Sequence, residues 1–208
     1  SYSTCSILDD GAGISYGKHQ CTDGGGALDL VCKRYIDLNG KHAAVLSQYM
    51  VHLQTNETTK FNSKIANYPS WLTSLISLLR NAGADPIMQQ AQNQIFDENY
   101  WTPAVNHAQR IGLQTGLGHL IVYDSTIHSG PGGVTIIRNL FPQKAPANGG
   151  DEKEWCLAYI AARRNWLSRS SNKLVQRTVY RMDALKQIAD SGNWDLNTPL
   201  TVRGIRIP

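Results

Sequence analysis

The sequence lacks a long apolar run, and this absence excludes a membrane-spanning helix as its main feature. A spanning helix needs roughly 20 consecutive apolar residues. The best candidate, WLTSLISLL at residues 71–79, is short and contains Thr73, Ser74 and Ser77. We interpret it as a helix of a soluble core and expect no membrane partner. Residues 1–10 have neither a basic start nor an apolar centre, so they do not resemble a signal peptide.

Cysteine is scarce, and its spacing excludes the common structural zinc motifs. The four cysteines are Cys5, Cys21, Cys32 and Cys156. They form no C-x-x-C pair and have no histidine at a ligand-like offset, so we expect neither a metal nor a cofactor. The even count is compatible with two disulfides in an exported protein, for which three pairings exist, or with four free thiols.

Charge is also sparse, and it is not clustered. Charged residues make up 17% of the chain, and 20 Lys and Arg against 16 Asp and Glu give a net charge of +4. The tightest basic pair is Arg163 and Arg164, whereas nucleic-acid-binding proteins usually gather basic residues on one face. We therefore expect no nucleic-acid partner. The mild positive charge favours an anionic partner or serves solubility alone.

Several enzyme motifs are absent, and carboxylate chemistry is what remains. The chain has no G-x-S-x-G, no H-E-x-x-H and no P-loop lysine motif. Glycoside hydrolysis needs two carboxyl groups flanking a sugar bond. The stretch DDGAGISYGKHQ, residues 9–20, places Asp9 and Asp10 on a glycine-bearing loop, where Ser15 or Tyr16 could hold a water molecule. The same DDG tripeptide is also typical of a solvated turn.

The periodicity of apolar residues predicts a mainly α-helical protein. Residues 1–26 contain six glycines and indicate loops and short strands. Asp23 is a predicted helix cap, and the extended tail covers residues 195–208. Helical patterns occupy the ranges 28–35, 43–53, 71–79, 85–96, 105–128, 151–167 and 173–191. We expect one domain, 1–208, in which residues 1–26 form a polar lobe along one wall of a cleft and residues 27–208 form helical lobes.

The order of several motifs resembles a known enzyme family. The run QQAQNQIFDENYWTPAVNHAQRIGLQTGLGHLIVYDSTIHSGPGG, the later PANGGDEKEWCLAYIAARRNWL and the final DLNTPL are similar to the chitosanases of glycoside hydrolase family 46. The loop wording SYGKHQ is closer to the lysozyme-like domains of phage particles and type VI secretion spikes. The resemblance covers about residues 8–200. It implies a two-lobed, largely helical lysozyme-like fold that holds a glycan in its cleft.

The resemblance also implies roles for individual residues. Asp10 matches the base that activates water in an inverting reaction, and Ser15 falls where the family has a threonine that positions this water. Asp124 matches an aspartate of a buried charge network, and Arg163 matches an arginine on the neighbouring helix. The loop arginine of the family is replaced by Ala12. The residues expected at the substrate are Tyr16, His19, Asp124 and Arg163.

The family's second catalytic group, a glutamate upstream of the loop aspartate, has no counterpart before Asp10. The chain contains only Glu57, Glu98, Glu152 and Glu154. Three explanations stay open: the glutamate lies ahead of Ser1, the protein has lost its acid and kept glycan binding, or Tyr2 or Asp9 has taken over. Tyrosine is a poor proton donor near neutral pH.

The expected partner is an amino-sugar polymer. Chitosan is a polycation, whereas peptidoglycan carries carboxylates and suits a basic protein. The net charge of +4 therefore favours a lysozyme-like peptidoglycan hydrolase, with chitosan hydrolysis as the alternative. An immunity or inhibitor protein is a further candidate partner, and the expected location is secreted or periplasmic.

Overall fold

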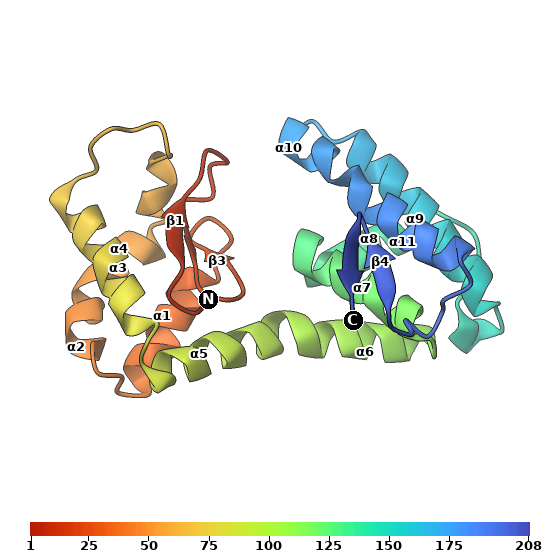
Figure 1. Cartoon of the computed structure of the whole chain (residues 1–208), viewed down its shortest axis with the longest axis horizontal. Coiled ribbons are helices and arrows are strands. Elements are labelled where there is room, and N and C mark those ends of the chain that lie inside the picture. Colours follow the sequence, from red (N-terminus) through yellow and green to blue (C-terminus); the bar gives the residue numbers. More distant parts are fainter. The chain divides into compact units, whose positions relative to one another are not determined.

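A computed structural model describes the whole chain, Ser1–Pro208. It consists of two compact units, Ser1–Glu98 and Asn99–Pro208, and each has its own hydrophobic core (Figure 1). The fold is mainly α-helical with a small β region at the N-terminus, as the sequence predicts. The boundary differs from the predicted one, because residues 1–26 form no lobe of their own and pack into the core of the first unit.

The first unit begins with a three-stranded antiparallel sheet in the order β1-β2-β3. The strands are β1 (Cys5–Ile7), β2 (Ile14–Tyr16) and β3 (Cys21–Thr22). In β2, Ile14 and Tyr16 are fully buried, whereas Ser15 between them faces outward and is partly exposed. This alternation follows from the two-residue period of a strand. The polar loop after β1 therefore leads directly into a strand that is held in the core.

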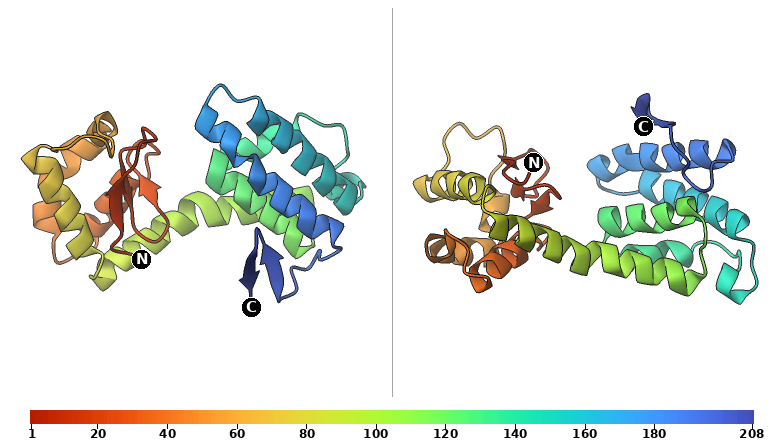
Figure 2. Two further views of the ribbon diagram at one scale, coloured as in Figure 1. Left: turned by 45° about the horizontal axis from the view of Figure 1, so that its top comes forward. Right: turned by 60° about the horizontal axis from the view of Figure 1, so that its bottom comes forward.

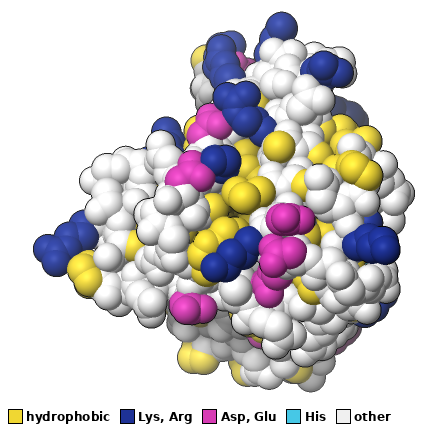
Figure 3. Space-filling view, turned by 90° about the vertical axis from the view of Figure 1, so that its right-hand side faces the viewer, with side chains coloured by type: hydrophobic (Ala, Val, Ile, Leu, Met, Phe, Trp, Pro, Cys, Tyr) yellow, Lys and Arg dark blue, Asp and Glu magenta, His cyan; other side chains and the backbone are white.

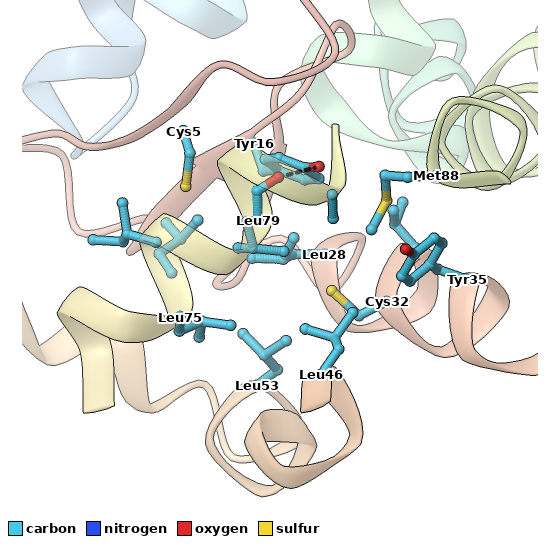
Figure 4. Packing of buried hydrophobic residues seen from close by; sticks show 14 of the residues in the cluster. Cys5, Tyr16, Leu28, Cys32, Tyr35, Leu46, Leu53, Leu75, Leu79 and Met88 are labelled. Carbon is cyan, nitrogen blue, oxygen red and sulfur yellow. Dashed lines mark hydrogen bonds between the residues drawn. The ribbon is translucent and has the colours of Figure 1, made fainter. Parts of the chain in front are cut away.

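Helices cover this sheet and complete the first core. The elements are α1 (Leu28–Asp37), α2 (Ala43–Leu46), η1 (Ser47–Tyr49), α3 (Met50–Gln54), η2 (Glu57–Lys60), α4 (Ser70–Ala82) and α5 (Pro86–Phe96). Figure 4 shows Leu28, Cys32 and Leu79 meeting in this core. Asp85 caps α5, since its Oδ1 accepts a hydrogen bond from Ile87 N at 3.0 Å.

The prediction that Asp23 caps a helix is wrong. The N-cap of α1 is Ala27, which makes no side-chain cap hydrogen bond. Asp23 is instead buried, and its carboxylate binds Thr58 on η2. The three glycines that follow Asp23 lengthen the connection, so the helix starts beyond the reach of the Asp23 side chain.

The second unit is a bundle of helices followed by a hairpin. A π-helical turn, η3 (Asp97–Trp101), leads into it. The elements are α6 (Thr102–Ile111), α7 (Gly116–Ser129), α8 (Pro131–Arg138), η4 (Pro146–Asn148), α9 (Glu152–Ser168), α10 (Lys173–Gln176), η5 (Arg177–Val179), α11 (Tyr180–Asp190), β4 (Leu200–Val202) and β5 (Ile205–Ile207). Figure 2 shows α9 and α11 side by side, and the two strands pair as an antiparallel hairpin.

The single helix predicted over residues 105–128 is two helices. Gly112 ends α6 with a φ of 86°, a left-handed value that glycine adopts without strain. Thr115 then caps α7 by accepting a hydrogen bond from Gly118 N at 3.1 Å. Gly118 lies in close contact with α9, because a Cβ at this position would overlap the carboxylate of Glu152.

All four cysteines are free thiols, so the disulfide alternative is not realised. Cys5, Cys32 and Cys156 are buried, and Cys21 is partly exposed. Burial raises the pKa of Cys5, Cys21 and Cys156 to about 12. None of the helices has both the length and the apolar character needed to cross a bilayer.

Candidate active site

The predicted base Asp10 lies on the loop that joins β1 to β2. Its side chain is exposed, forms no ion pair, and accepts a hydrogen bond from Ala12 N through Oδ1 at 3.0 Å. Gly11 and Gly13, with φ of 76° and 71°, allow the sharp backbone reversal around this turn. The carboxylate therefore has a fixed anchor on one oxygen and solvent access, which suits a group that takes a proton from water.

The neighbouring Asp9 has a different environment. Its carboxylate forms an ion pair with Lys64, which lies in the segment after η2. Ser15 is partly exposed on β2, with Thr22 opposite it on β3. Of the two adjacent aspartates, Asp10 is thus the one whose charge is not matched by a nearby cation.

Tyr2 and His19 are brought together by one residue of α5. The Tyr2 hydroxyl donates to Asn93 Oδ1 at 3.1 Å, and His19 Nε2 lies 3.1 Å from the same oxygen. The His19 ring stacks on Phe96 with centroids 3.9 Å apart. Both side chains are partly exposed, so they present a hydrogen-bonding and aromatic surface beside the turn that joins β2 to β3, at the other end of β2 from the Asp10 loop.

The prediction of a substrate contact at Tyr16 is wrong. Its side chain is fully buried, and its hydroxyl donates to the carbonyl of Leu79 at 2.7 Å, as Figure 4 shows. The inward side of β2 carries this residue, so the aromatic ring belongs to the core of the first unit.

In the second unit, Asp124 joins two arginines in a largely buried network. Arg163 Nη1 donates to Asp124 Oδ2, and Arg181 Nη2 donates to Asp124 Oδ1 at 2.5 Å. Burial raises the pKa of Asp124, but the hydrogen bonds and charges of Arg181 and Arg163 outweigh it and hold this pKa below the usual value. The carboxylate is therefore ionised at neutral pH and balances half of the charge that the arginines bring.

The network corrects one predicted role and adds a residue. Arg163 is fully buried, so it makes no direct substrate contact, and Asp124 has a side-chain exposure of only 14%. Arg181, which the sequence analysis missed, is the more accessible member at 28%. His128 lies close enough to be affected: burial, followed by the charges of Arg163 and Arg181, lowers its pKa.

Two hollows open on the second unit, and one of them borders this network. One, of about 410 Å³, is lined by Asp124, Arg181, Tyr180 and Arg203 with apolar residues from α7, α11 and the hairpin. The guanidinium of Arg203 lies 4.0 Å from the centroid of the Tyr180 ring. The other, of about 300 Å³, is mostly apolar and has Trp101 on its wall.

Three of the four glutamates have structural partners. Glu57 accepts a hydrogen bond from His52 at 2.5 Å, and Glu98 pairs with Arg34 at 2.9 Å. Glu152 accepts from the backbone amides of Gln114 and Thr115. These contacts explain each residue without a catalytic role, and Glu154 is simply exposed in the first turn of α9.

The structure shows no cluster of side chains that could hold a metal, and charges of both signs lie on the face drawn in Figure 3. No group of three or more His, Cys, Asp or Glu side chains is arranged to hold a metal ion. On the face drawn in Figure 3, Lys and Arg side chains alternate with acidic and apolar ones.

Comparison with known proteins points to one family. Residues 1–200 match the family model described as glycosyl hydrolase family 46. The chain is 28% identical over 211 residues to a chitosanase from Bacillus subtilis (strain 168), covering 94% of this chain and 72% of that protein. It is 31% identical over 203 residues to a chitosanase from Nocardioides sp. (strain N106), covering 93% of this chain and 67% of that protein.

Solved structures agree with this match. A chitosanase from Gynuella sunshinyii in complex with chitotetraose has a TM-score of 0.79 and 26% identity, over 99% of this chain and 88% of that one. The native chitosanase from Bacillus subtilis MY002 has a TM-score of 0.80 and 25% identity, over 100% of this chain and 90% of that one.

Proposed function

Because this chain belongs to glycosyl hydrolase family 46, and is therefore a glycosidase, we propose that it hydrolyses a β-1,4-linked amino-sugar polymer with Asp10 as the catalytic base. The observation that carries the proposal is the state of Asp10. It is exposed, free of ion pairs and oriented by Ala12 N. A carboxylate in this state can accept a proton from water as the water attacks the sugar.

The reaction also needs a proton donor for the leaving oxygen. The family resemblance assigns this role to a glutamate before Asp10, and we propose that it lies ahead of Ser1. For an inverting reaction, its carboxyl group and that of Asp10 should lie roughly 6.5 to 9.5 Å apart, which leaves room for the water. The alternative is a glycan-binding protein that has lost the acid. The presence or absence of a glutamate ahead of Ser1 separates the two.

Chitosan is the favoured substrate class. The relatives and structural neighbours are named chitosanases, and one of the neighbours is bound to chitotetraose. Peptidoglycan is the second candidate, because the net charge of +4 suits an anionic polymer better than a polycation. Tyr2 and His19 are proposed to contact the glycan in either case, since their polar edges and rings remain partly exposed.

Substitution of Asp10 tests the proposal directly. Asp10→Asn keeps the shape and the acceptor for Ala12 N but removes the base, so turnover should fall by about 10²- to 10⁴-fold. The measurement is the release of reducing ends from chitosan, with acetylated and deacetylated peptidoglycan in parallel and products identified by mass. Asp9→Asn is the matched control and should keep most of the activity, because Asp9 pairs with Lys64.

Three results would contradict parts of the proposed function. An Asp10→Asn protein that turns over as fast as the parent contradicts the assignment of the base. Products released with retained anomeric configuration, followed by NMR, contradict inversion. Digestion of peptidoglycan in preference to chitosan would reverse the order of the two substrates.

A further inference from the structure

We propose that Asp23 and Thr58 form a buried clamp that positions the Asp10 loop for catalysis. The inference rests on the proposed role of Asp10 as base. Neither Asp23 nor Thr58 is offered as a residue that touches the substrate. They act through the backbone of the residues that follow Asp10. A short series of hydrogen bonds connects them to the Asp10 carboxylate.

The clamp itself is a hydrogen-bonding pair inside the first unit. Asp23 is 1% exposed and Thr58 is fully buried. Asp23 Oδ2 accepts from Thr58 Oγ1 at 2.6 Å and from Thr58 N at 3.1 Å. The pair therefore fixes η2 against the turn that follows β3.

The same pair holds both backbone groups of Ile14, the first residue of β2. Thr58 Oγ1 accepts from Ile14 N at 3.0 Å, and Asp23 N donates to Ile14 O at 3.1 Å. The hydroxyl of Thr58 thus donates to Asp23 and accepts from Ile14 at once. Valine, which has the same shape as threonine, can do neither.

From Ile14 the connection to Asp10 is short. Gly24 N donates to Ala12 O at 3.0 Å, and Ala12 N donates to Asp10 Oδ1 at 3.0 Å. Gly13 lies between Ala12 and Ile14, and a Cβ at this residue would overlap Thr58. The backbone therefore lies directly against the Thr58 side chain. A shift of Thr58 moves residues 12–14, and with them the amide that orients the Asp10 carboxylate.

The choice of a buried carboxylate supports a positioning role. Burial raises the pKa of Asp23, the hydrogen bonds of Thr58 oppose this, and the charge of Asp29 on α1 adds to it. Asp23 Oδ1 and Asp29 Oδ1 are both buried without a hydrogen-bond partner. An apolar side chain would avoid these costs. Stability alone therefore does not explain the carboxylate at this position. A positioning role does, because the carboxylate fixes the geometry of η2 and of the start of β2.

The test compares Thr58→Val with Thr58→Ser in the natural protein. Thr58→Val should lower kcat by about tenfold to 100-fold with little change in KM, because misplacement of a catalytic group has an effect of this size. Thr58→Ser keeps the hydroxyl and should restore kcat. Hydrogen exchange of the Ala12, Ile14 and Gly24 amides should accelerate in Thr58→Val, while exchange within α4 and α5 stays unchanged.

A second pair of variants guards against a folding defect. Asp23→Asn keeps an acceptor for Thr58 and should retain the protected amides and most of kcat. Asp23→Ala removes the acceptor and should behave like Thr58→Val. The clamp is contradicted if Thr58→Val keeps the parent's kcat, or if the exchange of residues 12–14 is unaffected. If Asp10→Asn remains active, the proposed function fails instead, and the exchange data still decide whether the clamp holds the loop.

Discussion

Arg163 is a buried charge that depends on a single carboxylate, Asp124. Asp124→Asn leaves the guanidinium of Arg163 fully buried without an anion, and breaking such a pair typically costs about 3 to 5 kcal/mol. Urea denaturation followed by circular dichroism measures this loss. Asp183→Asn is the control, because its partner Arg164 is exposed and the pair should contribute little. Equal effects from both variants would contradict the buried-network interpretation.

Single residues differ in how far the sequence determines their role. The local sequence places Asp10 on a glycine-bearing loop, whereas only the family resemblance indicates Asp124. The structure shows that Asp10 is accessible and that Asp124 is ionised in a network. Tyr16 was misassigned, although the alternation I-S-Y of its strand carries the signal that it points inward. Arg181 lies 57 residues from Asp124, and no local pattern links a residue to so distant a partner.

At the scale of elements, Glu152 ties the first turn of α9 to the start of α7. Its carboxylate accepts from Thr115 Oγ1 at 2.7 Å and from two backbone amides. Glu152→Ala should therefore destabilise the protein by about 1 to 2 kcal/mol, measured by thermal unfolding. Glu154→Ala removes an exposed acid from the same helical turn and should have a small effect. A larger loss for Glu154→Ala would exclude the proposed link.

Most elements follow from local sequence, and the exceptions have physical reasons. Asp85 with Pro86 marks the start of α5, and Asp151 marks that of α9, because both caps act within three residues. The sequence does not predict the break at Gly112, because the helical spacing of apolar residues continues across it. The end of α6 is visible only in the φ of 86° at Gly112. Helix α8 was missed because Gly130 and Pro131 indicate a stop, although proline also suits a first helical turn.

At the scale of the whole molecule, the two units carry carboxyl groups that respond to acid with opposite sign. Burial raises the pKa of Asp23 in the first unit, so the stability linked to it is greatest in acid and is lost as the pH rises through its folded pKa. The arginines lower the pKa of Asp124 in the second unit despite its burial. Its contribution is present above the unfolded pKa and is lost as the pH falls through the lower folded value.

Hydrogen exchange between pH 7 and pH 3 can resolve this difference. Relative to Asp23→Asn, the parent's first unit should gain stability as the pH falls. Relative to Asp124→Asn, the second unit should lose its advantage below about pH 4, near the ordinary pKa of aspartate. Parallel acid responses of the two units in both comparisons would contradict these assignments. Because the units are Ser1–Glu98 and Asn99–Pro208, the exchange of each can be measured on its own peptides.

The raised pKa values of the four cysteines have a practical consequence for spectroscopy. Thiolate is the reactive form of cysteine, and these side chains stay protonated because burial keeps their pKa values high. Fluorophores or spin labels can therefore be attached at engineered surface cysteines against a quiet native background. One label on each unit would report their separation in solution, with and without a glycan.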